Sequence, residues 1–213
     1  DSSLLGDTTR FVEIEFVPLT PPENGMQVHL GPFEVQPQYE REFLNFVTID
    51  TLDEVYIKQV EVTMRPGSHH FILYSFEDFM PSILYPDPGV YRDYRDANGN
   101  YIINNLAVTY YHVFFAGTQW PYMNYHFPPG VALKVDINDG LDQNSHYINR
   151  TDEVLIGEVY TNIYFADPSE VEHEAHILSI NNSNFELPPQ ETTTLEHTIT
   201  VGERIHIFQL FSH

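Results

Sequence analysis

The chain has 213 residues, 42% of them hydrophobic, which is enough to form one large β domain or two smaller ones with a real core. Its 31 acidic and 9 basic residues give a formal net charge of -22, and such a surface disfavours nucleic acid and anionic membranes as partners. The chain has no cysteine, which excludes thiolate metal sites, disulfides and cysteine nucleophiles. No run of residues is long and apolar enough for a membrane span.

The first half of the chain predicts short strands separated by turns. Residues 11–17 alternate between apolar and acidic side chains, as a half-buried strand does. Later runs are rich in the β-branched and aromatic residues that strands favour, and a Pro66-Gly67 turn opens one of them. We expect strands at residues 11–17, 31–35, 42–49, 55–63 and 69–74.

Residues 80–105 form a long connection rich in proline and glycine, and a connection of this length is usually functional or mobile. Within it, Asp96, Asn98 and Asn100 place oxygen atoms at alternate positions, as a calcium-binding loop does. The segment lacks the glycine and the downstream glutamate of a complete EF-hand loop. The residues therefore indicate either a calcium site or, as the favoured interpretation, an Asn98-Gly99 turn.

The second half of the chain continues the pattern of short strands. An aromatic loop containing Trp120-Pro121-Tyr122 and ending at Pro128-Pro129-Gly130 separates two apolar runs. No stretch of helical length has a 3.6-residue period, so we expect an all-β fold, an antiparallel β-sandwich or jelly roll. The predicted strands are residues 106–117, 131–135, 140–149, 154–165, 176–180, 192–201 and 204–213.

Asp167-Pro168-Ser169 is the best candidate for a domain boundary. We expect an N-terminal β-sandwich domain over residues 1–168 and the beginning of a second, similar domain over residues 169–213. The sequence stops at His213 inside a predicted strand, where domains rarely end, so we expect the natural chain to be longer. A start at Asp1 agrees with removal of a signal peptide, and we expect a secreted, periplasmic or cell-surface protein.

Two adjacent histidines, His69 and His70, begin the strand that follows the Pro66-Gly67 turn. Successive side chains of a strand point to opposite faces. The pair can therefore share a metal only if the backbone twists or bulges there, or if the reach of the imidazoles compensates. The alternative is one buried and one exposed histidine without a metal.

His146 is the candidate third ligand, from a different predicted strand. Imidazole suits copper, zinc, iron and nickel, and without cysteine any such site must use nitrogen or oxygen ligands. Three neutral imidazoles leave a copper ion at its own charge, which tolerates both Cu(I) and Cu(II). Spacing alone does not single out this triple, because the chain has eleven histidines. His112, inside an apolar run, is more typical of a hydrogen-bonded core residue.

Three segments together resemble a known family. Residues 67–74, Gly-Ser-His-His-Phe-Ile-Leu-Tyr, are similar to the His-His strand of the copper type II, ascorbate-dependent monooxygenases, the family of peptidylglycine α-hydroxylating monooxygenase and dopamine β-monooxygenase. Residues 128–131 and 141–147 resemble its Pro-x-Gly-Val segment and its strand ending in His-Tyr. Residues 205–213 resemble the strand that opens its second copper site. The resemblance spans roughly residues 30–213, in the family's order.

The resemblance implies two copper sites in the full-length protein and assigns ligands to each. His69, His70 and His146 would hold the electron-transferring copper, and His213 would be the first ligand of the oxygen-activating copper. His206 matches a non-ligand position. The second histidine and the methionine of that other site have no counterpart here, since the four methionines all lie in the first predicted domain: Met26, Met64, Met80 and Met123.

The activity that the resemblance implies is hydroxylation of a C–H bond with O₂ and electrons from ascorbate or another one-electron reductant. The chain as given would bind one copper ion without catalysing hydroxylation, and the resemblance assigns no catalytic residue to it. Members of the family from animals carry several disulfides, whereas this chain has no cysteine, so the resemblance indicates a bacterial relative. Phe211 stands where peptide-hydroxylating members have an arginine for the substrate carboxylate, so a peptidylglycine substrate is not expected, and the substrate, a small molecule or a peptide, is unknown.

Two other functions compete with this interpretation. One is a cupin-like mononuclear metal enzyme that uses His69 or His70 with Glu77 on a jelly roll. The other is a non-enzymatic secreted β-sandwich for adhesion or carbohydrate binding, with Trp120 and Tyr122 stacking on the ligand, although Trp120 could equally plug the core. Serine-based catalysis has no support, because the Gly-x-Ser-x-Gly motif is missing.

Overall fold

The computed structural model describes residues 16–49, 54–136, 140–178 and 185–210. The chain divides into two units, residues 1–177 and residues 178–213. Most of the strand predicted at residues 11–17 lies outside the described residues.

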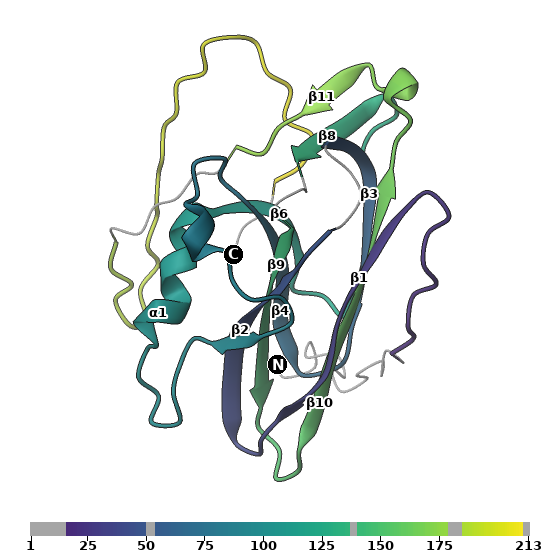
Figure 1. The fold of residues 1–213 in the computed structure, drawn as a ribbon. Helices are drawn as coiled ribbons and strands as arrows, with labels where there is room; N and C mark the ends of the chain where they lie inside the picture. Colours follow the sequence, from purple (N-terminus) through teal and green to yellow (C-terminus); the bar gives the residue numbers. More distant parts are fainter. Residues whose placement is uncertain (1–15, 50–53, 137–139, 179–184, 211–213) are drawn as a thin grey trace, which may run out of the picture. The chain divides into compact units, whose positions relative to one another are not determined.

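The first unit contains two β-sheets (Figure 1). Their neighbouring strands pair antiparallel, except that β11 runs parallel to β8. The six-stranded sheet has the order β1 (Gly25–Val35), β10 (Leu155–Phe165), β3 (Glu54–Met64), β8 (Val131–Asp136) and β11 (His173–Ala175), and β7 (Tyr122–His126) also pairs with β3. The five-stranded sheet has the order β5 (Tyr91–Asp93), β2 (Tyr39–Val47), β9 (Leu141–Asn149), β4 (Ser68–Phe76) and β6 (His112–Thr118).

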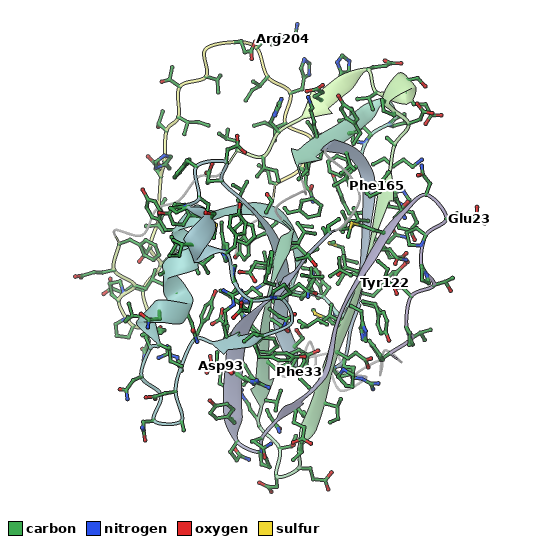
Figure 2. All side chains as sticks on the ribbon, viewed as in Figure 1. Glu23, Phe33, Asp93, Tyr122, Phe165 and Arg204 are labelled. Carbon is green, nitrogen blue, oxygen red and sulfur yellow. The ribbon has the colours of Figure 1, made fainter. Side chains whose placement is uncertain are left out.

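The main hydrophobic core lies between the two sheets (Figure 2). Because side chains alternate along a strand, each sheet turns one apolar face inward. Phe33 of β1 packs edge-on against Phe43 of β2 and Tyr147 of β9, with ring centroids 4.8 and 5.2 Å apart. These contacts join the two sheets and confirm the predicted all-β sandwich.

A second, smaller core lies on the outer face of the five-stranded sheet, beneath the segment that follows β4. This segment contains three helical turns, η1 (Ser82–Leu84), α1 (Ile103–Leu106) and η2 (Ala107–Tyr111). The strand prediction for residues 106–117 is wrong in its first half, because Val108 is buried from a helical turn and β6 begins only at His112. Among the described residues, no helix is long and apolar enough to cross a membrane. The core residues are Leu44, Phe46, Phe76, Met80 and Val108.

The Asp96 loop is a tight turn. Asp96 Oδ1 accepts hydrogen bonds from the backbone N–H groups of Asn98 and Asn100, at 2.8 and 2.9 Å, and Gly99 has a φ of 81°. Both N–H groups donate to the same oxygen, so the turn closes on its own aspartate. This geometry agrees with the predicted Asn-Gly turn, and the calcium site stays a prediction.

The chain after β10 departs from the sequence-based expectations. His173–Ala175 pair with Val131–Leu133, so the first unit continues beyond the boundary predicted at residue 168. The strands predicted at 176–180, 192–201 and 204–213 are absent from the described residues 176–178 and 185–210, where apolar side chains such as Leu210 are exposed. A strand needs a pairing partner as well as an apolar pattern, and these segments pair with no described strand. That residues 169–213 begin a second sandwich stays a prediction.

Candidate metal centre

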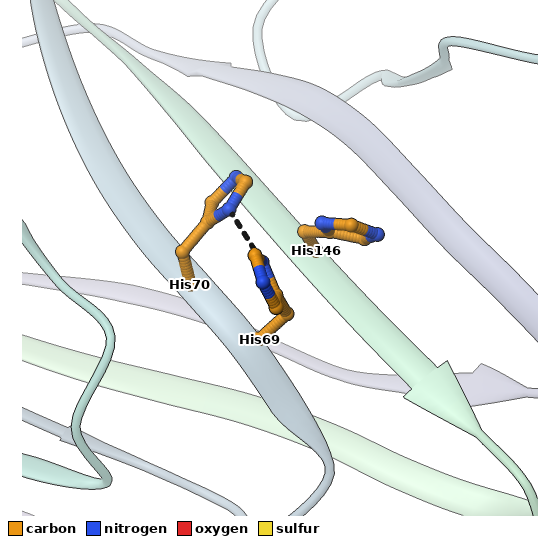
Figure 3. A group of neighbouring side chains, drawn as sticks. All are labelled: His69, His70 and His146. Carbon is orange, nitrogen blue, oxygen red and sulfur yellow. Dashed lines mark hydrogen bonds between the residues drawn. The ribbon is translucent and has the colours of Figure 1, made fainter. Parts of the chain in front are cut away.

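A β-bulge at His69 shapes the candidate site. In the antiparallel pairing of β4 with β9, Ser68 lies opposite Tyr147 and His70 lies opposite His146. Two steps along β4 therefore match one step along β9, and His69 is the extra residue. A bulge re-aims the side chains next to it, so both adjacent histidines turn toward His146 (Figure 3). A bulge is one of the ways, expected from the sequence, in which the pair can share a metal.

The residues just before the pair favour this backbone shape. Gly67 has a φ of 94°, a conformation that other residues adopt only with strain. A Cβ atom added there would lie 2.9 Å from Leu155 Cδ1. The Ser68 hydroxyl donates to the carbonyl oxygens of His70, at 3.2 Å, and His146, at 3.4 Å. This hydroxyl thus links β4 to β9 at the bulge.

The three histidines, here called the histidine cluster, come close enough to share one ion. One ring nitrogen of each lies within 4.8 Å of the others. The Nδ1 atoms of His69 and His70 are 3.1 Å apart. His70 and His146 are 4% and 9% exposed, whereas His69 reaches the solvent. Among the described residues, it is the one group of three or more His, Asp or Glu side chains that has the spacing of metal ligands.

Hydrogen bonds on the far side of two rings fix which nitrogen carries the proton. His70 Nε2 lies 2.6 Å from Asn144 Oδ1, and His146 Nε2 lies 2.8 Å from Glu40 Oε1. The Asn144 amide is oriented by its own donation to the backbone oxygen of Phe43, at 3.2 Å, so its oxygen faces His70. Both oxygens can only accept, so both Nε2 atoms donate and both Nδ1 atoms keep a lone pair for a metal.

The electrostatics of the site favour the neutral form of His69 and the ionised form of Glu42. Burial, followed by repulsion from His146 and His70, lowers the pKa of His69, although Glu40 and Glu42 act in the opposite sense. Burial raises the pKa of Glu42, but the hydrogen bond from His70 and the nearby histidine charges outweigh it, and its pKa is lowered. A neutral imidazole is the form that binds a metal.

The donor set fits a transition metal. Two nitrogen ligands at about 2.0 Å from an ion, in tetrahedral geometry, lie about 3.3 Å apart. The separation of the His69 and His70 Nδ1 atoms is 3.1 Å. Metal-ligating histidines usually donate their other N–H to a carboxylate or carbonyl oxygen, as His70 and His146 do here. Three imidazoles without a thiolate suit copper or zinc.

The other predicted residues fall into two groups: one that lies outside the described residues, and others that the structure describes apart from the histidine cluster. His213 lies outside the described residues. His112 is a hydrogen-bonded core residue as predicted, with Nε2 2.9 Å from Asp142 Oδ2 and its ring stacked on Tyr74. Glu77 follows the end of β4, and seven residues of extended strand place it about 23 Å from His70. Trp120 is 74% exposed, so it does not plug the core.

Three residues that support the histidine cluster were not predicted from the sequence: Glu40, Glu42 and Asn144. Asn144 stands two positions before His146, and this spacing on one strand was a usable signal, because alternate residues share a face. The two glutamates belong to β2, where Glu42 lies opposite His146. Their role depends on the register between β2 and β9, which has no local signature in the sequence.

Comparison with known protein families finds no match for this chain, and comparison with curated proteins finds none. The functional assignment therefore depends on the geometry of the histidine cluster.

Proposed function

We propose that the histidine cluster binds one copper ion and serves as the electron-transfer centre of a copper-dependent monooxygenase, which hydroxylates a C–H bond with O₂. The observation that carries this proposal is the bulge at His69, because it brings two adjacent histidines and His146 to one face of the sheet. Copper, when bound, would supply one-electron chemistry. The likeness of three segments to the copper type II monooxygenases favours copper over zinc.

The residues of this chain support a role in holding an electron rather than in breaking the C–H bond. Three neutral imidazoles tolerate both copper oxidation states, and the supporting hydrogen bonds of His70 and His146 hold the rings in place. The oxygen-activating site would begin at His213 and would need a further histidine and a methionine. We therefore expect copper binding without hydroxylation by this chain alone, in a protein that acts outside the cytoplasm.

Copper stoichiometry tests the proposal. We expect one copper per chain in the wild type, nitrogen hyperfine structure in its Cu(II) electron paramagnetic resonance spectrum, and loss of the ion in His146→Ala. His126→Ala is the matched control, because His126 is exposed on β7 outside the histidine cluster and should leave binding unchanged. A folded wild type without copper, or a His146→Ala variant that keeps it, would overturn the proposal. Hydroxylation by the purified chain alone would contradict the electron-transfer role.

One observation favours a second candidate function, a carbohydrate-binding domain. Trp120 is largely exposed and Tyr122 is half exposed, so aromatic faces near the start of β7 are open to solvent. The Tyr122 hydroxyl donates to Glu61 Oε1 at 2.8 Å, which holds that side chain. Electrophoresis in gels containing neutral polysaccharide tests this function: retardation that disappears in Trp120→Ala supports it, and unretarded migration of the wild type excludes it for the polysaccharide used.

The cupin-like alternative has no geometric support, because Glu77 lies too far from His69 and His70 to share an ion with them.

A further inference from the structure

Two glutamates of β2 approach the histidine cluster in different ways. Glu42 lies directly opposite His146 in the pairing of β2 with β9, and Glu40 lies opposite Ile148. Glu40 is therefore the diagonal neighbour of His146, within reach of a long side chain. Its Oε1 accepts from His146 Nε2 at 2.8 Å, whereas Glu42 Oε1 lies 3.6 Å from His70 Nε2.

The contact of Glu40 joins an exposed side chain to a buried one. The Glu40 side chain is 62% exposed and that of His146 is 11% exposed. The hydrogen bond leaves the lone pair of His146 on Nδ1, the nitrogen that Glu40 does not contact. A carboxylate at this position also raises the basicity of the imidazole through the ring.

We infer that Glu40 is a positioning residue of the histidine cluster, which holds His146 in its Nε2–H form and makes the site favour divalent over monovalent copper. This inference rests on the proposed function and deepens it. A negative charge beside a ligand stabilises the higher charge of the ion, and a more basic imidazole binds the harder Cu(II) better than the softer Cu(I). Since Glu40 is exposed, its removal should leave the fold intact.

Separate affinities for the two oxidation states test the inference. Glu40→Gln keeps an oxygen that can accept from His146 but removes the charge, Glu40→Ala removes both, and Glu153→Gln is a matched control at an exposed glutamate of the β9–β10 loop. Dissociation constants are measured by competition with chromogenic chelators, for Cu(I) under anaerobic conditions and for Cu(II) in air. The Cu(II) spectrum of each variant reports whether the three nitrogen ligands remain.

We expect the Cu(II) dissociation constant of Glu40→Gln to rise by about tenfold or more, within the range found for partners of metal-ligating histidines. The Cu(I) constant should change much less, and Glu153→Gln should match the wild type. A tenfold change in the ratio of the two constants raises the reduction potential by about 59 mV. Glu40→Ala should weaken Cu(II) binding further and broaden the spectrum, since His146 loses its acceptor.

The outcomes separate this inference from the proposed function. If the wild type binds copper through His146 but Glu40→Gln leaves both constants unchanged, or weakens both equally, only the role of Glu40 is overturned. If the folded wild type binds no copper, the proposed function and this inference fail together.

Discussion

Asp142 offers the sharpest test of the fold around the histidine cluster. Its carboxylate is fully buried on β9 and pairs with two cationic or potentially cationic side chains, Arg92 of β5 and His112 of β6. The Arg92 and His112 side chains are only 12% and 4% exposed. One carboxylate thus links three strands of the five-stranded sheet.

The substitution Asp142→Asn keeps the shape of the side chain and removes its charge. The guanidinium of Arg92 would then be buried without a charged partner, and breaking a buried ion pair on one side costs about 3–5 kcal/mol. For a unit of this size, this loss corresponds to a fall in Tm of about 6–20 °C.

Urea unfolding followed by circular dichroism measures the change, with the m-value as a check that the same surface unfolds. Asp93→Asn is the matched control. Asp93 Oδ1 lies 2.7 Å from Arg41 Nε, so it also forms an ion pair with an arginine, but its side chain is more exposed than that of Asp142. That variant should lose about 1 kcal/mol. A loss for Asp142→Asn no larger than that of Asp93→Asn would refute the reasoning that the buried charge of Arg92 depends on Asp142.

Three further predictions concern the bulge, the pH dependence of stability and the reductant. Gly67→Ala should cost about 1–3 kcal/mol, measured by thermal unfolding, because of the positive φ, and should weaken copper binding; an unchanged Tm would contradict this. Burial raises the pKa of Glu158, but its hydrogen bond from Arg65 and other contacts outweigh this, and its pKa is lowered. The stability that Glu158 contributes is therefore complete above the unfolded pKa, about 4.3, and is lost as the pH falls through the folded pKa. The Glu158→Gln variant should consequently lose less stability than the wild type between about pH 5 and pH 3, measured by urea unfolding at each pH, and an equal loss would contradict this. With a net charge of -22 and two glutamates beside the site, reduction of copper by a cationic complex should slow as salt rises, whereas reduction by ascorbate should not slow, in stopped-flow measurements.

The strands of the sandwich were predictable because their side chains alternate or form compact apolar runs. The predictions for residues 42–49 and 55–63 correspond to β2 and β3 with small shifts at their ends. The helical turns before His112 were not predictable in this way, because a short apolar run fits a buried turn as well as a strand. The same ambiguity affects residues 185–210, where an apolar pattern occurs without a described pairing partner.

The histidine cluster was predictable only in part. The residue types, and the need for a twist, a bulge or the reach of the imidazoles to bring the pair together, followed from His69 and His70 alone, since alternation would otherwise separate them. The bulge itself depends on how β4 pairs with β9, and the approach of Glu40 depends on how β2 pairs with β9. These registers join residues far apart in the chain, and no local pattern encodes them.

A single extra residue, His69, separates this sheet from one without the histidine cluster. Without His69, Ser68 would still lie opposite Tyr147 and His70 would still lie opposite His146, so every other pair of the β4–β9 ladder could remain as it is. One inserted codon next to a histidine already in place would therefore complete the histidine cluster in such a sandwich, and its deletion would remove it. The hydrophobic core would be the same in both forms, so natural selection could add or discard the histidine cluster without rebuilding the domain.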